Sequence, residues 1–371
     1  MLMKKKYFLV AYTICVVLFY SAAYLVINLL PQSEKTDIVT VLPANTSTPL
    51  LIEAAATPPS VSAQAAVVID AKSGAVLFSH NSDARLPMAS TTKIMTAKII
   101  LDMLPLNKTV TVPKEATLVE GSSIYLTENE EITVEALLYG LLLESGNDAA
   151  TALATACSGS VEKFAALMND TGKQMGLQNT SFANPHGLSA ESHFTTAYEL
   201  AYITMCTLRN PKFREIVSTQ KYIAPSTDGK YTRYFFNHNK LLRTYNGATG
   251  VKTGYTEAAG RCLVSSAEKD GESYICVTLD DRNDWRDHSC LLDYAFENYD
   301  SIEIAGENAF SVYGNRVRYT NAEPVYLTVA KGEKPVLSYK VTLTDSTSYT
   351  DYYSNGVKLG TFYLKPTEAG F

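Results

Sequence analysis

The sequence has few cysteines, and they are not arranged to bind a metal. Six are present among 371 residues, and no two form a Cys-x-x-Cys pair, which argues against a metal site. Cys15 lies in an apolar N-terminal stretch, which leaves an odd number elsewhere and argues against a full disulfide framework. We expect most of the others to be small buried hydrophobes. They are Cys157, Cys206, Cys262, Cys276 and Cys290.

The chain also lacks an excess of basic residues. Its formal net charge is −6 at pH 7, so its composition gives no sign of a nucleic-acid partner. Its 371 residues are too many for one small core. The length predicts about two domains with accessory segments.

Charge is absent from a stretch of 24 residues, Tyr7–Leu30, which is long enough to span a bilayer as a helix. Lys4, Lys5 and Lys6 precede it, and this asymmetry predicts that the N-terminus stays inside and the rest outside. The alternative is a cleaved signal peptide, with a small-residue site at Ser21-Ala22-Ala23. Both interpretations export the following chain, and we favour an uncleaved anchor over residues 1–30.

Residues 31–64 are rich in Pro, Thr, Ser and Ala and show no periodicity. They predict a flexible spacer that holds the next domain about 30 Å from the membrane on average. Beyond it, residues 65–300 mix helical and strand patterns, whereas residues 303–371 are strand-like and rich in tyrosine. We therefore predict a main domain at 65–300 and a small separate β domain at 303–371.

Within the main domain the patterns are specific enough to place several elements. Two strands with a turn at 70–74 are predicted over 65–78, and antiparallel strands are predicted from 249 onward. Thr196 and Glu199 form a capping-box pair, so Glu199 is expected to be structural. One helix is predicted to begin near Ser90. Further helices are predicted over 132–145, after 147, over 160–175, after Thr196 and over 284–299.

Three short motifs stand in order along the chain. They are Ser90-Thr91-Thr92-Lys93, Ser145-Gly146-Asn147 and Lys252-Thr253-Gly254. Each alone is common and is typical of surface or turn residues. Their order in an exported chain, each on the kind of element that the chemistry needs, indicates a serine-based catalytic site.

The first motif has the parts of an activated nucleophile. A serine hydroxyl is a weak nucleophile at pH 7 and needs a base. Residues three apart share a helix face, so the Lys93 amine can contact the Ser90 hydroxyl. An amine accepts a proton only when it is neutral, and both burial and a nearby second cation, Lys252, favour the neutral form. The apolar neighbours of Lys93 suit such a base. Ser90 also offers a backbone N–H for an oxyanion hole.

The second and third motifs supply the remaining groups. The Ser145 hydroxyl can relay a proton to the leaving amine, and the Asn147 amide can hold Lys93 and a substrate carbonyl. Lys252 and Thr253, on an edge strand, can bind a terminal carboxylate. Gly254 allows the substrate backbone to approach closely.

These motifs and their surroundings resemble those of the low-molecular-mass penicillin-binding proteins, the D-alanyl-D-alanine carboxypeptidases of the serine peptidase clan that includes β-lactamases. The resemblance covers residues 65–300 and, more loosely, the segment after them. The matching segments are "RLPMASTTKIMTA", "LLLESGNDAATALA", "TSFANPHGL", "FNHNKLL" and "GVKTGYTEAAGRCLVSSA".

The resemblance implies an α/β (α+β) catalytic domain of the β-lactamase and transpeptidase type, with an antiparallel sheet and a helical subdomain, followed by a small all-β domain. It implies that Ser90 is acylated, that Lys93 is the base, that Ser145 shuttles the proton and that Lys252 binds substrate. Tyr255, after the third motif, is expected to give a second oxyanion N–H from its backbone. No metal and no cofactor are implied.

Two features depart from the family pattern. Relatives often keep an amphipathic C-terminal helix that binds the membrane, but this chain ends in "GTFYLKPTEAGF". The N-terminal segment is expected to take over anchoring. Some relatives carry an arginine where this chain has His238, between Asn237 and Asn239, which leaves the contact of His238 with a substrate carboxylate open.

Other residues have ordinary interpretations. His186 in "NPHGL" is expected to be a turn or packing residue and not a catalyst. Aromatic residues near the fourth matching segment are expected in the core, in preference to a sugar-binding platform. They are Tyr231, Tyr234, Phe235 and Phe236.

The sequence therefore predicts a peptidoglycan DD-carboxypeptidase that removes the terminal D-Ala of stem pentapeptides ending in D-Ala-D-Ala, with β-lactams as covalent inhibitors. It is expected at the outer face of the bacterial cytoplasmic membrane, or secreted if the N-terminal segment is cleaved. The main alternative is an endopeptidase that cuts peptide cross-links with the same machinery. A penicillin-recognising sensor is a weaker alternative. A β-lactamase is disfavoured because no glutamate between Asn147 and Lys252 is followed four residues later by asparagine.

Overall fold

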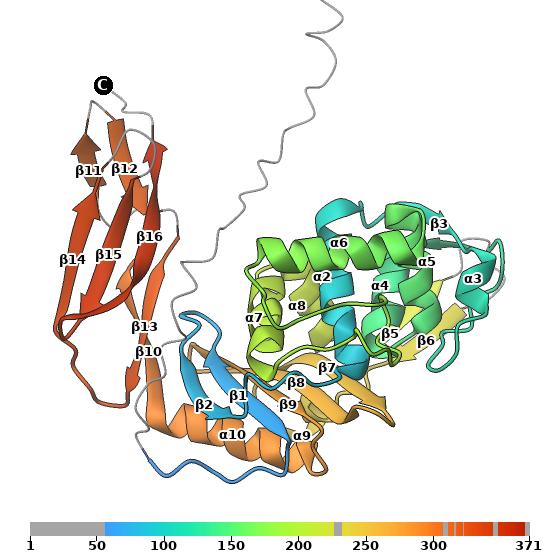
Figure 1. Ribbon diagram of the computed structural model, residues 1–371, viewed down its shortest axis with the longest axis horizontal. Coiled ribbons are helices and arrows are strands. Elements are labelled where there is room, and N and C mark those ends of the chain that lie inside the picture. The colour runs from blue at the N-terminus through green and yellow to red at the C-terminus, as the bar shows by residue number, and fades with distance from the viewer. Residues whose placement is uncertain are drawn as a thin grey trace, which may run out of the picture. The chain divides into compact units, whose positions relative to one another are not determined.

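The computed structural model describes residues 56–225, 232–306, 311–314, 317–321, 323–343 and 348–367 (Figure 1). The predicted membrane segment and the spacer up to residue 55 lie outside these residues. Within the described part of the chain, no helix combines the length and the apolar character needed to cross a membrane.

Five antiparallel strands form the central sheet, in the spatial order β2-β1-β9-β8-β7. Their bounds are β1 Ala65–Asp70, β2 Val76–His80, β7 Ala248–Thr256, β8 Gly260–Lys269 and β9 Glu272–Leu279. β1 pairs with the distant β9 through Val67 and Val277, which closes the sheet around the helices that lie between them in sequence. Every residue of β1 is buried, as its unbroken apolar run requires. β7 lies at the edge, as predicted.

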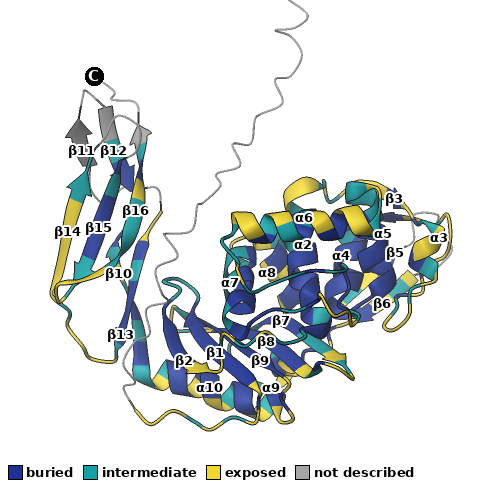
Figure 2. Ribbon diagram, viewed as in Figure 1, coloured by how far each residue is buried: buried dark blue, intermediate teal, exposed yellow. Residues whose placement is uncertain are grey.

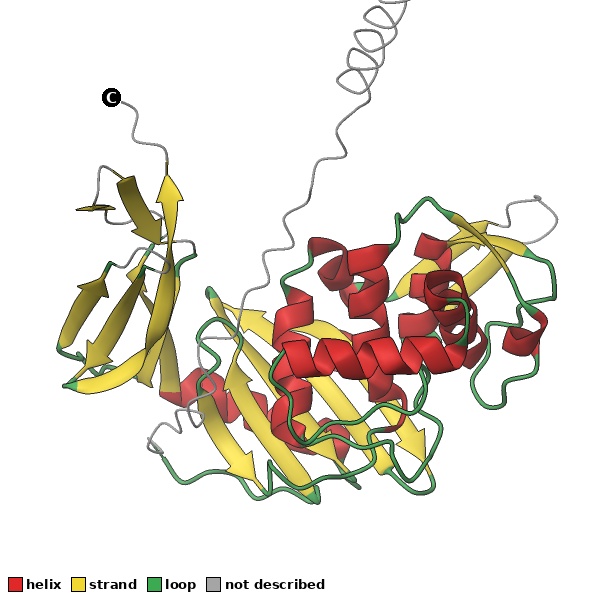
Figure 3. Ribbon diagram, turned by 45° about the horizontal axis from the view of Figure 1, so that its top comes forward, coloured by secondary structure: helices red, strands yellow, loops and turns green. Residues whose placement is uncertain are grey.

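Helices cover both faces of this sheet, as Figures 2 and 3 show. On one face, α2, α4, α5 and α7 pack with alternate residues of β1 into the largest buried apolar cluster. On the other face, α10 packs against the remaining residues of β1 and β9. The helix bounds are η1 Ala89–Thr92, α2 Lys93–Met103, α3 Lys114–Thr117, α4 Val134–Leu143, α5 Asn147–Ser158, α6 Val161–Gln174, α7 Ala197–Leu208, α8 Pro211–Ser218, α9 Leu241–Thr244 and α10 Asp284–Asn298.

Helix α4 illustrates how the sequence builds the first of these layers. Its residues, VEALLYGLLL, are apolar on all sides, and all but Glu135 are buried. The Thr133 hydroxyl caps the helix by accepting a hydrogen bond from Ala136 N. Helix α4 therefore begins two residues later than the predicted start at 132, because residues 131–133 form the short strand β4, Glu131–Thr133.

Two small hairpins flank the helices. β4 pairs with β3, Thr109–Thr111. β5, Lys221–Pro225, pairs with β6, Thr232–Phe236. In the second hairpin the side chains alternate, so Phe235 is buried whereas Tyr234 and Phe236 are each about half exposed. The predicted core position is confirmed for Phe235 and wrong for Tyr234 and Phe236, and Tyr231 lies outside the described residues.

All the elements that the structure describes between residues 299 and 367 are strands, as predicted. β10 pairs with β13, and five further strands form a sheet in the order β11-β12-β16-β15-β14. Asn355 and Gly356 both have positive φ, +49° and +79°, which is typical of a tight hairpin turn. The strand bounds are β10 Tyr299–Ala305, β11 Ser311–Gly314, β12 Val317–Asn321, β13 Val325–Ala330, β14 Leu337–Thr342, β15 Tyr349–Ser354 and β16 Val357–Thr367. The predicted division into separate domains at 300–303 stays a prediction.

Two local expectations need correction. Thr196 does cap α7 by accepting from Glu199 N, but the Glu199 carboxylate accepts from Gln178 N, Asn179 N and the Thr180 hydroxyl instead. Glu199 is therefore structural, as expected, but it anchors a loop and does not close a capping box. Among the cysteines in the described part of the chain, all of which are free, Cys262 and Cys276 are buried, Cys157 and Cys206 are partly buried and Cys290 is exposed, so the expectation that most of them are buried is wrong.

Candidate active site

The Ser90 side chain stands on a tight turn at the start of the η1–α2 helical segment. Ala89, just before it, has φ +47°, a left-handed conformation that non-glycine residues seldom adopt. Two threonine hydroxyls hold the turn: Thr91 donates to Met88 O at 2.6 Å and Thr92 donates to Ala89 O at 2.7 Å. The Ser90 residue itself is only half-buried.

Lys93 is fully buried one turn further along, as its apolar neighbours in the sequence suggest. Its amine lies 3.0 Å from Ser90 Oγ, so the expected contact is present. The amine also donates to Asn147 Oδ1 at 2.7 Å and to the backbone oxygen of His186. Burial, with the charge of Lys252 as the second cause, lowers the pKa of Lys93 well below its usual value.

Ser145 and Asn147 lie where α4 ends and α5 begins. Ser145 is buried and has φ +63°, which breaks the helix after Glu144. The Asn147 amide donates to Glu120 O at 2.7 Å, while its oxygen accepts from Lys93, so both ends of this side chain are fixed. Its orientation is therefore set by the hydrogen-bond network.

A nearby loop is tied to the same junction. The Asp148 carboxylate accepts from the backbone N–H groups of Ile124 and Leu126 and from the Ser123 hydroxyl. Asn147 N donates to Ser122 O at 2.7 Å. These bonds fix the backbone of residues 122–126 beside the second motif.

The third motif lies on β7, directly against the serine turn. A Cβ atom on Gly254 would lie 3.1 Å from Ser90 N and 3.2 Å from Met88 O, so only glycine permits this approach without displacement. Lys252 is buried, and its amine donates to Thr253 O at 2.9 Å. Burial lowers the pKa of Lys252 to about 7, and the charge of Glu144 opposes that shift. Tyr255, the next residue after the motif, has an exposed side chain.

Several residues at the site were missed or undervalued from the sequence. His186 is a turn residue, as expected, but its carbonyl also accepts the second hydrogen bond from Lys93. A Cβ atom on Gly187 would lie 2.0 Å from Ala89 O, so this loop packs directly on the serine turn. The resemblance of "TSFANPHGL" to the family was the only signal for this loop.

His238, the departure from the family pattern, lies beside an acidic group. Its ring Nε2 is 3.1 Å from Glu144 Oε2, and the other Glu144 oxygen accepts from Phe236 N at 2.6 Å. His238 is half-exposed. A substrate carboxylate near His238 would therefore also meet the Glu144 carboxylate.

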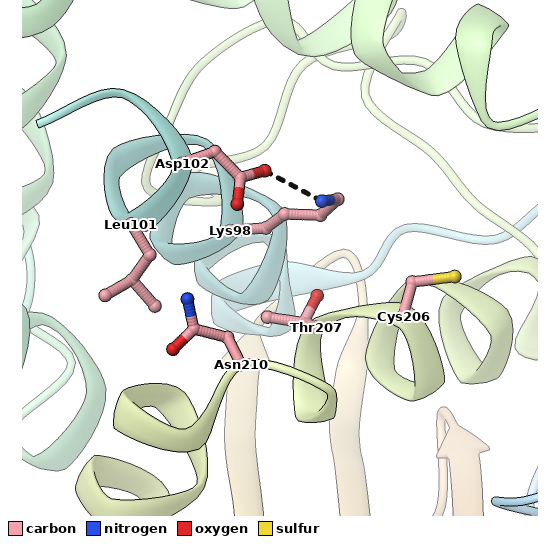
Figure 4. Close-up of a pocket in the computed structure, with 6 residues that line it drawn as sticks. All are labelled: Lys98, Leu101, Asp102, Cys206, Thr207 and Asn210. Carbon is pink, nitrogen blue, oxygen red and sulfur yellow. Dashed lines mark hydrogen bonds and ion pairs between the residues drawn. The ribbon is translucent and has the colours of Figure 1, made fainter. Parts of the chain in front are cut away.

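Neither of two hollows in the described residues is lined by the three motifs, and the larger, an open one of about 420 Å³, lies between residues 56–59 and α10. No group of three or more His, Cys, Asp or Glu side chains in the described residues could hold a metal ion. A cavity of about 20 Å³ lies between α2 and the α7–α8 junction, room for about one water molecule. Figure 4 shows its lining, to which none of the three motifs contributes: Lys98, Leu101, Asp102, Cys206, Thr207 and Asn210.

The chain is similar in sequence to proteins of known family. Residues 52–283 match the family model described as D-alanyl-D-alanine carboxypeptidase. The chain is 35% identical to the D-alanyl-D-alanine carboxypeptidase DacF of Bacillus subtilis over 322 residues, which cover 82% of this chain and 81% of that protein.

Two solved structures are similar as well. Penicillin binding protein 5 of Haemophilus influenzae superposes with a TM-score of 0.71 at 26% identity, covering 84% of this chain and 98% of that one. The DD-transpeptidase of Streptomyces K15 superposes with a TM-score of 0.62 at 32% identity, covering 65% and 100%.

Proposed function

The chain belongs to the D-alanyl-D-alanine carboxypeptidase family, and from that membership we propose a serine hydrolase whose nucleophile is Ser90. It removes the terminal D-alanine from peptides that end in D-Ala-D-Ala, in two steps with an acyl-enzyme between them. The substrate class is the stem peptide of peptidoglycan. β-Lactams, which resemble the D-Ala-D-Ala end, acylate the same serine.

The observation that carries this proposal is the arrangement of hydrogen bonds at Lys93. A neutral amine has two N–H groups and one lone pair. Asn147 Oδ1 and His186 O take the two N–H groups, which leaves the lone pair for the hydroxyl of Ser90 at 3.0 Å. The lowered pKa of Lys93 favours this neutral form. Lys93 is therefore suited to accept the Ser90 proton as the oxygen attacks.

The attack places negative charge on the substrate carbonyl oxygen. The backbone N–H groups of Ser90 and Tyr255 are proposed to bind that oxygen, since Gly254 brings β7 against the serine turn. One such donor contributes about 3 kcal/mol to lowering the barrier.

Acylation forms one bond and breaks another. The bond from Ser90 Oγ to the carbonyl carbon forms, and the peptide C–N bond to the last D-alanine breaks. The proton taken by Lys93 passes through the Ser145 hydroxyl to the leaving amine. Water then attacks the ester and gives the shortened peptide, with the Ser90 hydroxyl restored.

Recognition of the terminal carboxylate is assigned to Lys252 and Thr253. Lys252 supplies the charge, and both residues lie on the edge strand that packs against the serine turn. Glu144 is close enough for its charge to act on Lys252, and it contacts His238, the residue at which some relatives carry arginine.

The protein is further proposed to work at the outer face of the cytoplasmic membrane, held there by residues 1–30. The support is the 24-residue uncharged stretch preceded by three lysines. Fractionation of cells that make the full chain should recover it, uncleaved, in the membrane pellet. A soluble form that begins near Tyr24 would replace this proposal with secretion.

The decisive experiment compares wild type with Ser90→Ala. Fluorescent penicillin should label the wild type and leave Ser90→Ala unlabelled, whereas Ser79→Ala, an exposed serine bonded to Ser82, should label normally. A synthetic pentapeptide should yield the tetrapeptide and free D-alanine by mass spectrometry. Equal labelling of wild type and Ser90→Ala would reject the proposal. Fast hydrolysis of nitrocefin with an untouched pentapeptide would favour a β-lactamase.

A further inference from the structure

A buried histidine outside the three motifs lies beneath the serine turn. His193 belongs to the loop between α6 and α7 and is only 3% exposed. Its Nε2 lies 2.7 Å from the Thr92 hydroxyl, and its Nδ1 accepts from Ala183 N at 3.0 Å. The edge of its ring packs against Phe182.

The direction of these hydrogen bonds follows from the backbone. Ala183 N–H can only donate, so His193 Nδ1 must be the unprotonated nitrogen. The neutral ring then carries its proton on Nε2 and donates it to Thr92 Oγ1. Thr92 uses its own proton to bind Ala89 O at 2.7 Å. The chain of donors therefore runs in one direction, from Ala183 through His193 and Thr92 to the Ala89 carbonyl.

The last acceptor, the Ala89 oxygen, belongs to the peptide unit that also carries the Ser90 N–H. Ala89 C=O and Ser90 N–H are parts of one planar group and point in opposite directions. Fixing the Ala89 oxygen therefore fixes the direction of the Ser90 N–H. We propose that His193 is a positioning residue that, through Thr92, aims the Ser90 N–H at the oxyanion of the transition state.

The turn needs such a constraint because its backbone is unusual. Ala89 has φ +47°, a conformation that persists only when the surroundings impose it. Gly187 packs close to the same Ala89 oxygen, where a Cβ atom would clash at 2.0 Å. Thr92 and the Gly187 loop thus both restrict the position of this oxygen.

The charge state of His193 is compatible with this task. Burial, and then the positive charge of Lys93, lower the pKa of His193 to about 4. The ring is therefore neutral near pH 7 and keeps the single Nε2 proton that the chain of donors requires. It does not titrate where the enzyme works, so a constant orientation is maintained.

This inference rests on the proposed function, since it assigns a role in acylation of Ser90. Substitution by each of the two amide residues tests the two nitrogens of the imidazole separately. His193→Asn places an oxygen near the former Nδ1 and keeps the bond from Ala183, but it loses the donor to Thr92. His193→Gln places an amide N–H near the former Nε2 and keeps the donor to Thr92, but it loses the acceptor for Ala183.

The matched control is His288, the buried histidine of α10 on the opposite face of the sheet. It lies 2.6 Å from the Ser265 hydroxyl and 3.0 Å from the Thr278 hydroxyl, and burial lowers its pKa to about 3. His288→Asn therefore also removes one hydrogen bond from a buried imidazole, at a site without contact to the serine turn.

The measurement is the acylation of full-length protein by a fluorescent penicillin, followed over a range of concentrations and normalised to folded protein. His193→Asn should lower the limiting acylation rate constant by about tenfold to a hundredfold and leave the half-saturating concentration unchanged, because the Ser90 N–H acts mainly in the transition state. His193→Gln should stay within about threefold of wild type. His288→Asn should lower the melting temperature without changing the rate constant.

Thr92 provides a second test in case the histidine variants fold poorly. Thr92→Ser keeps the hydroxyl and should retain acylation, whereas Thr92→Val should lower the acylation rate constant as much as His193→Asn does. The double variant with His193→Asn and Thr92→Val should lose no more of the acylation rate than either single variant, because both substitutions interrupt the same series of hydrogen bonds.

The outcomes are separable. His193→Asn and His193→Gln with equal rate constants, or losses in acylation that follow the melting temperature in all variants, would overturn the positioning role. A wild type that penicillin does not acylate at Ser90 would instead overturn the proposed function.

Discussion

The sheet and helices that carry the three motifs differ from the C-terminal strands in how they treat buried polar groups. Around the motifs, buried Lys93, Asn147 and Asp148 each make several hydrogen bonds to groups from distant parts of the chain. In the C-terminal region, five buried side-chain oxygens lack a partner among the described residues, against two such atoms, Asn239 Nδ2 and Asp281 Oδ2, in the rest of the described chain. The five are Ser301 Oγ, Thr320 Oγ1, Asn321 Oδ1, Ser348 Oγ and Thr350 Oγ1.

The apolar cores differ in the same direction. The cluster beneath the motifs joins residues from β1, β7 and most of the helices. The described cluster of the C-terminal strands contains three fully buried residues, Ala305, Val325 and Tyr352. Figure 2 shows the contrast as dark blue on the sheet and α2, against yellow along β14. Burying a polar group is costly unless it is bonded, so the complete networks mark the region where geometry is held most firmly.

The largest expected effect comes from Lys93→Arg. Arginine keeps the charge but cannot give up its proton in a protein, so the buried base is lost. Acylation of Ser90 should fall by about a hundredfold to ten-thousandfold, the usual contribution of a positioned base. Stopped-flow measurement with a fluorescent penicillin gives the rate constant.

Lys98→Arg is the control, since Lys98 stands on the same helix but forms an ion pair at 2.8 Å with Asp102 at the surface. It should acylate like wild type. A Lys93→Arg variant within tenfold of wild type would mean that Lys93 is not the base.

A smaller effect is expected from pH, acting through Lys252. Burial lowers the pKa of Lys252 to about 7, with Glu144 opposing the shift. A lysine is charged below its pKa, so the ammonium is lost as pH rises through about 7, while the peptide carboxylate stays ionised. KM for a D-Ala-D-Ala peptide should therefore rise above pH 7, by up to roughly tenfold per pH unit. kcat should not fall in the same range, because Lys93 works in its neutral form.

Steady-state kinetics of wild type and Lys252→Arg across this range test the assignment. The guanidinium stays charged, so KM of the variant should be independent of pH even if its absolute value is higher. A wild-type KM that does not change with pH would remove the charge of Lys252 from carboxylate recognition.

Some contacts of this site could be predicted from the sequence and others could not, depending on how far apart the two residues lie along the chain. Ser90 and Lys93 are three apart on one helix, so their contact follows from helix geometry alone. The contact of Lys93 with Asn147 spans 54 residues and was expected only because the motifs were interpreted together. That β7 is a strand followed from the alternating pattern that begins at 249.

The contributions of His186 and His193 were not predictable from the sequence in the same way. His186 contributes a backbone oxygen, which any residue carries, and its partner lies 93 residues away. His193 is 101 residues from Thr92 and stands in a loop without helical or strand periodicity. Tyr234 and Phe236 were misplaced because an aromatic run was assigned to the core without applying the alternation of a strand.

The smallest effect is expected where the two regions meet. The Thr328 hydroxyl of β13 donates to Asp70 Oδ2 at 2.7 Å and lies 2.6 Å from the Ser73 hydroxyl. Asp70 is buried, so Thr328→Val leaves its carboxylate with one donor fewer and should lower the free energy of unfolding by about 1–3 kcal/mol. Acylation of Ser90 should stay unchanged, because Thr328 lies on β13, and its partners Asp70 and Ser73 lie at the end of β1 and in the following turn, apart from the Lys93 network.

Thr350→Val is the matched control within the C-terminal strands. Its hydroxyl is buried without a partner among the described residues, so removing it deletes no hydrogen bond and should leave stability equal or slightly higher. Urea unfolding followed by circular dichroism compares the two variants with wild type. Equal stability of Thr328→Val and Thr350→Val would show that the bond to Asp70 contributes nothing, and the contrast between fully bonded and unbonded buried hydroxyls would then not extend to this contact.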